Sequence, residues 1–108
     1  MRRVHLVSLL VFAIVSSLPS HAVAQSKFFS FERDVDRPGS DFSNTASNSP
    51  EDCSFACQLQ NHCRAWTFVR PGIQGPSGRC FFKDPAPRAV RNNCCTSGAR
   101  LGRPVPVD

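Results

Sequence analysis

Cysteine is the residue with the richest chemistry in this chain of 108 amino acids. The chain has six cysteines between residues 53 and 95, at Cys53, Cys57, Cys63, Cys80, Cys94 and Cys95. Their thiols can bind metal ions, react with substrates or form disulfides, and the redox state of the compartment decides which use is favoured. An even number of cysteines in a short exported chain favours a disulfide framework.

The start of the chain predicts export. Arg2 and Arg3 are followed by an apolar run over residues 6–18, and Ala22-Val23-Ala24 has the small-x-small pattern of a signal-peptidase site. The run of 13 residues is shorter than the roughly 20 that a membrane-spanning helix needs. We expect residues 1–24 to be a cleaved signal peptide, with a secreted or periplasmic product that has no stable membrane insertion.

Other uses of the cysteines are disfavoured by their spacing. A zinc site of Cys53, Cys57, His62 and Cys63 would place a C-x-x-x-C motif on a helix, which is not the turn of a zinc knuckle. The adjacent pair Cys94-Cys95 is not the C-x-x-C motif of a thiol oxidoreductase. We therefore predict disulfides, no metal site and no cofactor.

The remaining polar residues do not form an active-site pattern. His62 is the one histidine after the expected signal, and its place at the end of a predicted helix favours an exposed residue. A catalytic base would need a nucleophile and an orienting partner. Asp34, Asp36 and Asp41 lack the spacing of an EF-hand loop and are expected to be solvated turn residues. We predict no catalytic residues.

The charge argues against one further class of function. The chain has a formal net charge of +5, which falls to +3 when Arg2 and Arg3 leave with the signal. The other basic residues are spread along the sequence instead of forming one patch, and an exported protein rarely meets nucleic acid. We predict no nucleic-acid partner.

One helix is predicted by strong local signals. Ser49 can cap the helix, and Pro50 suits its first position because the missing N–H costs nothing there. The helix is expected to run from Pro50 to about Asn61. Cys53 and Cys57 lie four residues apart on one face, so both can point at a sheet beneath.

Short strands surround this helix in the prediction. The aromatic run 27–33 predicts a first strand, which is followed by a turn over residues 34–41 and a polar loop over residues 44–48. Three later strands are expected at residues 65–69, 80–83 and 96–101. They are separated by a loop with three glycines and two prolines over residues 70–79 and by a Pro-containing loop over residues 84–93. One helix among antiparallel strands is an α+β domain.

The ordered motifs resemble those of the PAN/Apple domain family in a short, stand-alone bacterial form. They are D-R-P-G-S-D-F (residues 36–42), the helix with C-x-x-x-C, C-R-A-W-T-F-V (63–69), G-P-S-G-R-C-F-F-K (75–83) and C-C-T-S-G (94–98). The resemblance implies a small disulfide-stapled antiparallel sheet with one helix packed across it. It divides the chain into a signal peptide (1–24), a lead-in (25–29), a domain (30–100) and a Pro-rich tail (101–108).

The resemblance also implies two disulfides, Cys53–Cys80 and Cys57–Cys63. They would close loops worth roughly 3.6 and 2.4 kcal/mol by chain entropy. Cys94 and Cys95 are left over. A bond between these neighbours is strained, because their Cα atoms are about 3.8 Å apart across a trans peptide. The alternative, in which one of the two pairs with a helix cysteine, stays open.

The resemblance implies an exported, non-catalytic module that binds a protein or carbohydrate ligand. The alternative is a structural or inhibitory accessory that tethers or blocks an exported enzyme. We expect Trp66 to pack in the core. The recognition surface is expected in the loop 70–79 with Arg88 and Arg91, and its proposed ligand-binding residues are Arg70, Arg79 and Arg88. The ligand and the oligomeric state do not follow from the sequence.

Overall fold

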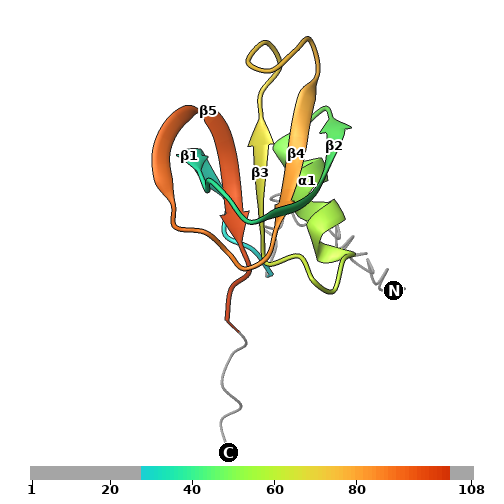
Figure 1. Cartoon of the computed structure of the whole chain (residues 1–108), viewed down its shortest axis with the longest axis vertical. Coiled ribbons are helices and arrows are strands. Elements are labelled where there is room, and N and C mark those ends of the chain that lie inside the picture. Colours follow the sequence, from blue (N-terminus) through green and yellow to red (C-terminus); the bar gives the residue numbers. More distant parts are fainter. Residues whose placement is uncertain (1–27, 103–108) are drawn as a thin grey trace, which may run out of the picture.

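The structure is a computed structural model that describes residues 28–102, in which one helix packs on a five-stranded antiparallel sheet (Figure 1). The expected signal peptide and residues 103–108 of the expected tail lie outside the described residues. The strands are β1 (Glu32–Asp36), β2 (Asp41–Ser47), β3 (Ala65–Val69), β4 (Gly78–Lys83) and β5 (Val90–Ala99). Their spatial order is β1-β5-β3-β4-β2. The predicted α+β fold is confirmed.

The helix α1 (Pro50–Gln58) begins where the sequence predicts and ends earlier. The hydroxyl of Ser49 accepts a hydrogen bond from the backbone N–H of Asp52 at 3.2 Å, which caps the first turn. The expected extension to Asn61 is wrong, because the bond Cys57–Cys63 turns the chain back. In a continued helix the Cα atom of Cys63 would lie about 9 Å further along the axis, whereas the two Cα atoms are 5.3 Å apart. Among residues 28–102 there is no helix of the length and apolarity that a bilayer crossing requires.

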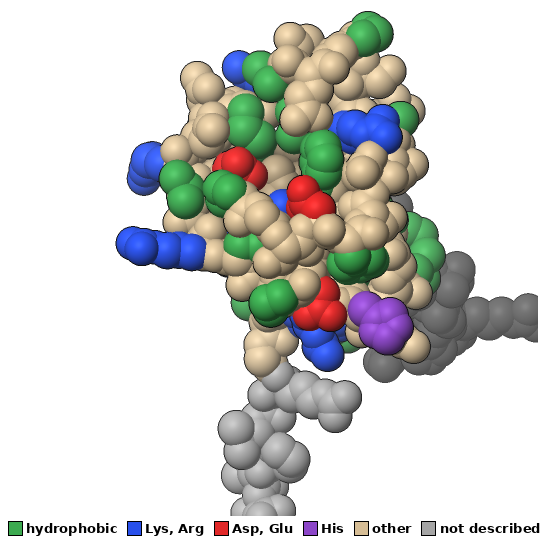
Figure 2. Space-filling model, viewed as in Figure 1, with side chains coloured by type: hydrophobic (Ala, Val, Ile, Leu, Met, Phe, Trp, Pro, Cys, Tyr) green, Lys and Arg blue, Asp and Glu red, His purple; other side chains and the backbone are tan. Residues whose placement is uncertain are grey.

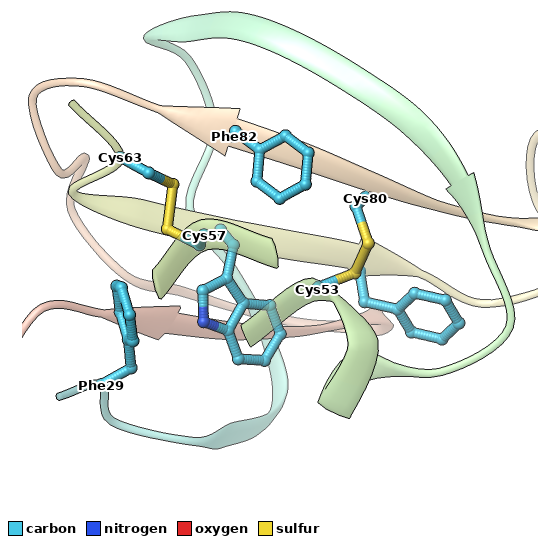
Figure 3. Close-up of a cluster of buried hydrophobic side chains, with 8 residues drawn as sticks. Phe29, Cys53, Cys57, Cys63, Cys80 and Phe82 are labelled. Carbon is cyan, nitrogen blue, oxygen red and sulfur yellow. A yellow bond between two sulfur atoms is a disulfide. The ribbon is translucent and has the colours of Figure 1, made fainter. Parts of the chain in front are cut away.

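The central strand β3 lies where the sequence predicts it, and all five of its residues are buried. It is hydrogen-bonded to β4 on one side and to β5 on the other. Its side chains alternate between the two faces of the sheet, so that Trp66 and Phe68 join the core beneath α1. Figure 3 shows this core, with the bonds Cys53–Cys80 and Cys57–Cys63 beside Phe29 and Phe82.

Trp66 fills the centre of this core and is fully buried, as expected. Its ring lies 5.6 Å from that of Phe31, measured between centroids. Gly98 of β5 leaves the room for it, because a Cβ atom there would come within 2.6 Å of the indole nitrogen and 2.3 Å of the Ser30 carbonyl oxygen. A larger residue at position 98 would therefore displace both the ring and the first residues of the domain.

The edges of the sheet differ from the prediction. The first strand begins at Glu32, after the three phenylalanines of the run 27–33, and Phe29 makes only an isolated bridge with Arg100. Residues 41–47, predicted as turn and loop, form the edge strand β2, six of whose seven residues are exposed. A solvated edge strand does not have to alternate polar and apolar residues. The polar composition of residues 41–47 therefore did not predict a strand. Likewise β5 starts at Val90, inside a predicted loop.

Candidate ligand-binding cleft

The sheet has a second face, which α1 does not cover (Figure 1). Because side chains alternate along a strand, Thr67 and Val69 point to this face when Trp66 and Phe68 point to the helix. Figure 2 shows this face, where hydrophobic side chains gather around acidic groups. The β1–β2 connection crosses this face in Figure 1.

A cleft of about 180 Å³ lies on this face. The central strands provide Thr67, Val69, Phe81 and Lys83. The β1–β2 region provides Asp36, Pro38, Gly39 and Asp41, and the remaining lining comes from Ile73, Gln74, Cys94 and Cys95. The cleft thus combines apolar side chains with charged groups, and it draws on segments that are far apart in the sequence.

Lys83 is the most unusual residue of the cleft, because its charged side chain is only 3% exposed. Its ammonium group donates to the carboxylate of Asp41 at 2.5 Å and to the carbonyl oxygen of Gly39 at 3.1 Å. A buried ammonium group needs such partners to offset the loss of water. Gly39 has φ +95°, a conformation that favours glycine. Lys83 therefore fixes the β1–β2 connection over the sheet.

The third disulfide joins the neighbours Cys94 and Cys95, whose Cα atoms are 3.7 Å apart. This pair, which the sequence left open, lies in an irregular part of β5. Arg33 pairs with Thr96 and Val35 with Arg91, so the single residue Asp34 faces four residues of β5. Such an insertion is a large bulge, and it re-aims the side chains that it contains. The bulge brings both cysteines to the cleft.

The carboxylate of Asp36 lies next to this disulfide. One of its oxygens and the two sulfur atoms are all within 4.8 Å of one another. Among residues 28–102 this carboxylate has no hydrogen-bond or ion-pair partner. Asp36 therefore differs from Asp41, whose carboxylate is engaged by Lys83.

Two buried hydroxyl groups connect the strands behind the cleft. The side-chain oxygens of Thr67 and Ser97 are 2.8 Å apart, and Ser97 also donates to the carbonyl oxygen of Val35 at 2.7 Å. These bonds join β3, β5 and β1 and leave Thr67 without the geometry of an activated nucleophile. His62 is exposed in the turn after α1 and is not among the residues that line the cleft.

A salt bridge stabilises the edge of the sheet beside the cleft. The guanidinium group of Arg37 bonds both carboxylate oxygens of Glu32, at 2.9 and 2.8 Å, and also donates to the carbonyl oxygen of Pro87. The hydrogen bond to Glu32 raises the pKa of Arg37 above its usual value. Arg37 therefore links β1 to the loop before β5 and helps to hold the cleft in shape.

The three arginines predicted to bind ligand lie outside the cleft lining. Arg70 is exposed at the end of β3, and Arg79 lies close to it because Arg79 pairs with Val69 across the strands. The guanidinium group of Arg79 donates to the side-chain oxygen of Asn44 at 2.8 Å. Arg88 follows the other end of β4 and is exposed. The structure thus places Arg70 and Arg79 together and Arg88 apart from them.

Two features of the cleft were not predicted from the sequence, the buried Lys83 and the proximity of Asp36 to the adjacent cysteines. A lysine that ends a buried aromatic strand, as in C-F-F-K, was the available signal for Lys83. Asp36 and Cys94 are brought together by the bulge in β5 and by the pairing of β1 with β5. Neither the bulge nor the pairing of β1 with β5 has a local sequence pattern.

Comparison with known proteins identifies the domain. No curated protein matches the chain significantly. Residues 35–83 match the family model described as PAN domain. This span contains α1 and both disulfides that join the helix to its surroundings, Cys53–Cys80 and Cys57–Cys63. PAN domains are generally non-catalytic modules that bind proteins or carbohydrates. Over residues 35–83 this chain therefore carries a PAN domain, the family that its ordered motifs resemble.

Proposed function

We propose that this chain is an exported, non-catalytic binding module whose protein or glycan ligand contacts the cleft on the face opposite α1. The observation that carries the proposal is the cleft itself, which lies in a PAN domain and combines apolar walls with fixed charged groups. Ligand sites are concave and mostly apolar, with a few polar groups that set orientation. The lining of Val69, Ile73 and Phe81 beside Asp36 and Lys83 has this character.

The size of the cleft favours one part of a macromolecule as its occupant. Its volume of about 180 Å³ is below the range of roughly 300–1,000 Å³ typical of drug-sized ligands and cofactors. One side chain of a protein or one sugar unit of a glycan is a suitable occupant. Ile73 adds contact area at the mouth, since it is 49% exposed and belongs to the loop between β3 and β4.

The polar contacts favour binding over catalysis. The hydroxyl of Thr67 is hydrogen-bonded to Ser97, and the ammonium group of Lys83 is engaged by Asp41 and Gly39. In the described part of the chain, the hydroxyl and amino groups that line the cleft are therefore both engaged by protein partners, and neither is free to act as the nucleophile that acyl transfer would need. Its residues are suited to orienting a ligand.

The predicted arginines would enlarge the surface that contacts the ligand beyond the cleft. Arg70 and Arg79 lie near one another at one end of the sheet and can contact carboxylate or sulfate groups of the same ligand. Arg88 can contribute only from the other end of β4. Export is part of the proposal, because three disulfides need an oxidising compartment, which the expected signal peptide would provide as the periplasm or the cell exterior.

The alternative function is an accessory that tethers or blocks an exported enzyme, and one observation favours it. Phe55 of α1 and Leu59, the C-cap residue four positions later, are 62% and 69% exposed. Two exposed apolar side chains on one helix face are suited to a protein partner. This surface is on the opposite side of the sheet from the cleft, so the two functions can be separated by mutation.

The test is a glycan array and a pull-down screen with the oxidised protein, its Ile73→Glu variant and its Leu59→Glu variant. Both substitutions place the same charge on an exposed apolar residue, so each is the control for the other. Capture that Ile73→Glu alone weakens supports the cleft. Capture that Leu59→Glu alone weakens supports the accessory function. If neither variant affects capture, both surfaces are excluded.

A further inference from the structure

We propose that Cys94, Cys95 and Asp36 form a redox-gated metal site, which takes a thiophilic divalent cation such as Zn²⁺ once the bond between the two cysteines is reduced. This site goes beyond ligand binding by the cleft and does not depend on it. It rests on three properties of the residues, namely their spacing, the access to the disulfide and the availability of the carboxylate.

The spacing suits a small metal ion. The carboxylate oxygen and the two sulfur atoms lie within 4.8 Å of one another. In a tetrahedral zinc site, Zn–S bonds of about 2.3 Å and Zn–O bonds of about 2.1 Å place the ligand atoms roughly 3.6–3.8 Å apart. After reduction the two sulfur atoms separate, and side-chain rotation alone can bring the three atoms to that spacing. Three protein ligands leave the fourth position for water.

Access makes this disulfide the first one that a reductant reaches. Cys53, Cys57 and Cys63 are fully buried, and Cys80 is 1% exposed. Cys94 is partly exposed, and both members of the vicinal pair line the open cleft. Thiol–disulfide exchange requires that the attacking thiolate contacts a sulfur atom. The two bonds beneath α1 should therefore survive conditions that open the bond Cys94–Cys95.

The chemistry requires a thiol reductant, either two small thiol molecules or one dithiol. One thiolate attacks a sulfur atom of the pair, forms a mixed disulfide and releases the other cysteine as a thiolate. The second thiol displaces the first cysteine and leaves as the oxidised disulfide of the reductant. Two electrons thus pass to the protein, whose two sulfur atoms become thiols. Metal binding then releases two protons, one from each thiol.

Asp36 is the carboxylate that this site needs. Among residues 28–102 it has no hydrogen-bond or ion-pair partner, so no bond has to be broken when it turns to a metal ion. Asp41, the other carboxylate of the cleft, is bound by Lys83 at 2.5 Å. Carboxylate oxygen and thiolate sulfur are both ligands that zinc accepts.

The experiment begins with limited reduction of the oxidised protein by dithiothreitol, followed by removal of the reductant under nitrogen. Thiol counting and alkylation mapping should find two thiols per chain, at Cys94 and Cys95. Titration with Zn²⁺, and with Cd²⁺ to detect the thiolate charge-transfer band, should then show one metal ion per chain. The oxidised protein and the Cys94→Ser/Cys95→Ser variant should show no such uptake.

Asp36→Asn tests the third ligand, and Asp34→Asn is its matched control. Asp34 is an exposed aspartate in the same strand and lies outside the cluster, so both variants lose one charge. Asp36→Asn should weaken binding at least about tenfold, and Asp34→Asn should leave it nearly unchanged. Equal effects of the two variants, alkylation of Cys53 or Cys80 before Cys94, or no uptake after reduction would each overturn the proposal.

Discussion

The two faces of the sheet are stabilised by different chemistry. The face under α1 is closed by aromatic side chains and by two disulfides whose cysteines are almost completely buried. The opposite face is fixed by polar contacts, of which Lys83 with Asp41 and Thr67 with Ser97 are the main ones, and it stays open as a cleft. The closed face can therefore provide stability while the open face is available to a ligand.

The disulfides show the same division. Cys53–Cys80 spans 27 positions along the chain, and by chain entropy such a loop contributes about 3.6 kcal/mol. Cys94–Cys95 spans one position and can constrain the unfolded chain only slightly. The first bond acts on the stability of the whole domain, whereas the second acts on the local shape of the bulge.

The largest effect is expected in the closed face. Trp66→Ala removes a fully buried ring from the centre of the core and should lower the free energy of unfolding by about 3–5 kcal/mol. Urea denaturation of the oxidised protein measures this change. Phe42→Ala, which removes a ring that is 46% exposed on the edge strand, is the control and should cost much less. Similar losses from both would mean that the closed face is not the main source of stability.

Removing the disulfides one at a time compares the two faces directly. Cys53→Ala/Cys80→Ala should lower the free energy of unfolding by about 3.6 kcal/mol, because the unfolded chain regains the entropy of a long loop. Cys94→Ser/Cys95→Ser should cost only about 1 kcal/mol, since it frees a loop of minimal length. Thermal denaturation of both double variants would show the difference. A vicinal variant that is the less stable of the two would contradict this assignment.

The closed face contains the features that the sequence predicted best. Strand β3 and the start of α1 depend on local signals, an apolar run and a Ser49-Pro50 cap, and both lie where expected. The two helix-anchored disulfides are the pairs that the family resemblance implied. Trp66 lies in the same core, as its position beside Cys63 in a strand suggested.

The open face was much harder to predict because it depends on pairing between distant segments. Strand β2 is polar and exposed, so only its register with β4 makes it a strand. The bulge in β5 and the positive φ of Asp34 bring Asp36 to cysteines nearly sixty positions away. No local pattern contains that information. The sequence therefore predicted ligand binding by three arginines that lie outside the cleft lining.

The polar contacts of the open face can be ranked by mutation. Asp41→Asn leaves the ammonium group of Lys83 buried without a counter-charge and should cost about 1.5–3 kcal/mol. Lys83→Met leaves the carboxylate of Asp41, which is 41% exposed and can be solvated, and should cost about 1 kcal/mol or less. Equilibrium unfolding of both single variants measures the asymmetry. The reverse order would show that Asp41, not Lys83, carries the desolvation cost.

The smallest effect on stability, and the one that bears on binding, concerns the arginines. Joint replacement of Arg70, Arg79 and Arg88 by alanine should change the free energy of unfolding by less than about 0.5 kcal/mol for each residue, as is usual at exposed positions. If they contact the ligand, capture should weaken, and the loss should shrink at high salt, where exposed charges are screened. Binding titrations at two salt concentrations, beside a melting curve, measure both quantities.

Because Arg88 lies at the other end of β4 from Arg70 and Arg79, the triple variant can be divided into informative parts. A ligand that occupies the cleft and extends past Val69 meets Arg70 and Arg79, so that double variant should account for most of the loss. Arg88→Ala alone should then have little effect. If Arg88→Ala causes the loss instead, the ligand lies toward the loop 84–89. Full binding by the triple variant, with loss in Ile73→Glu, would confine recognition to the cleft itself.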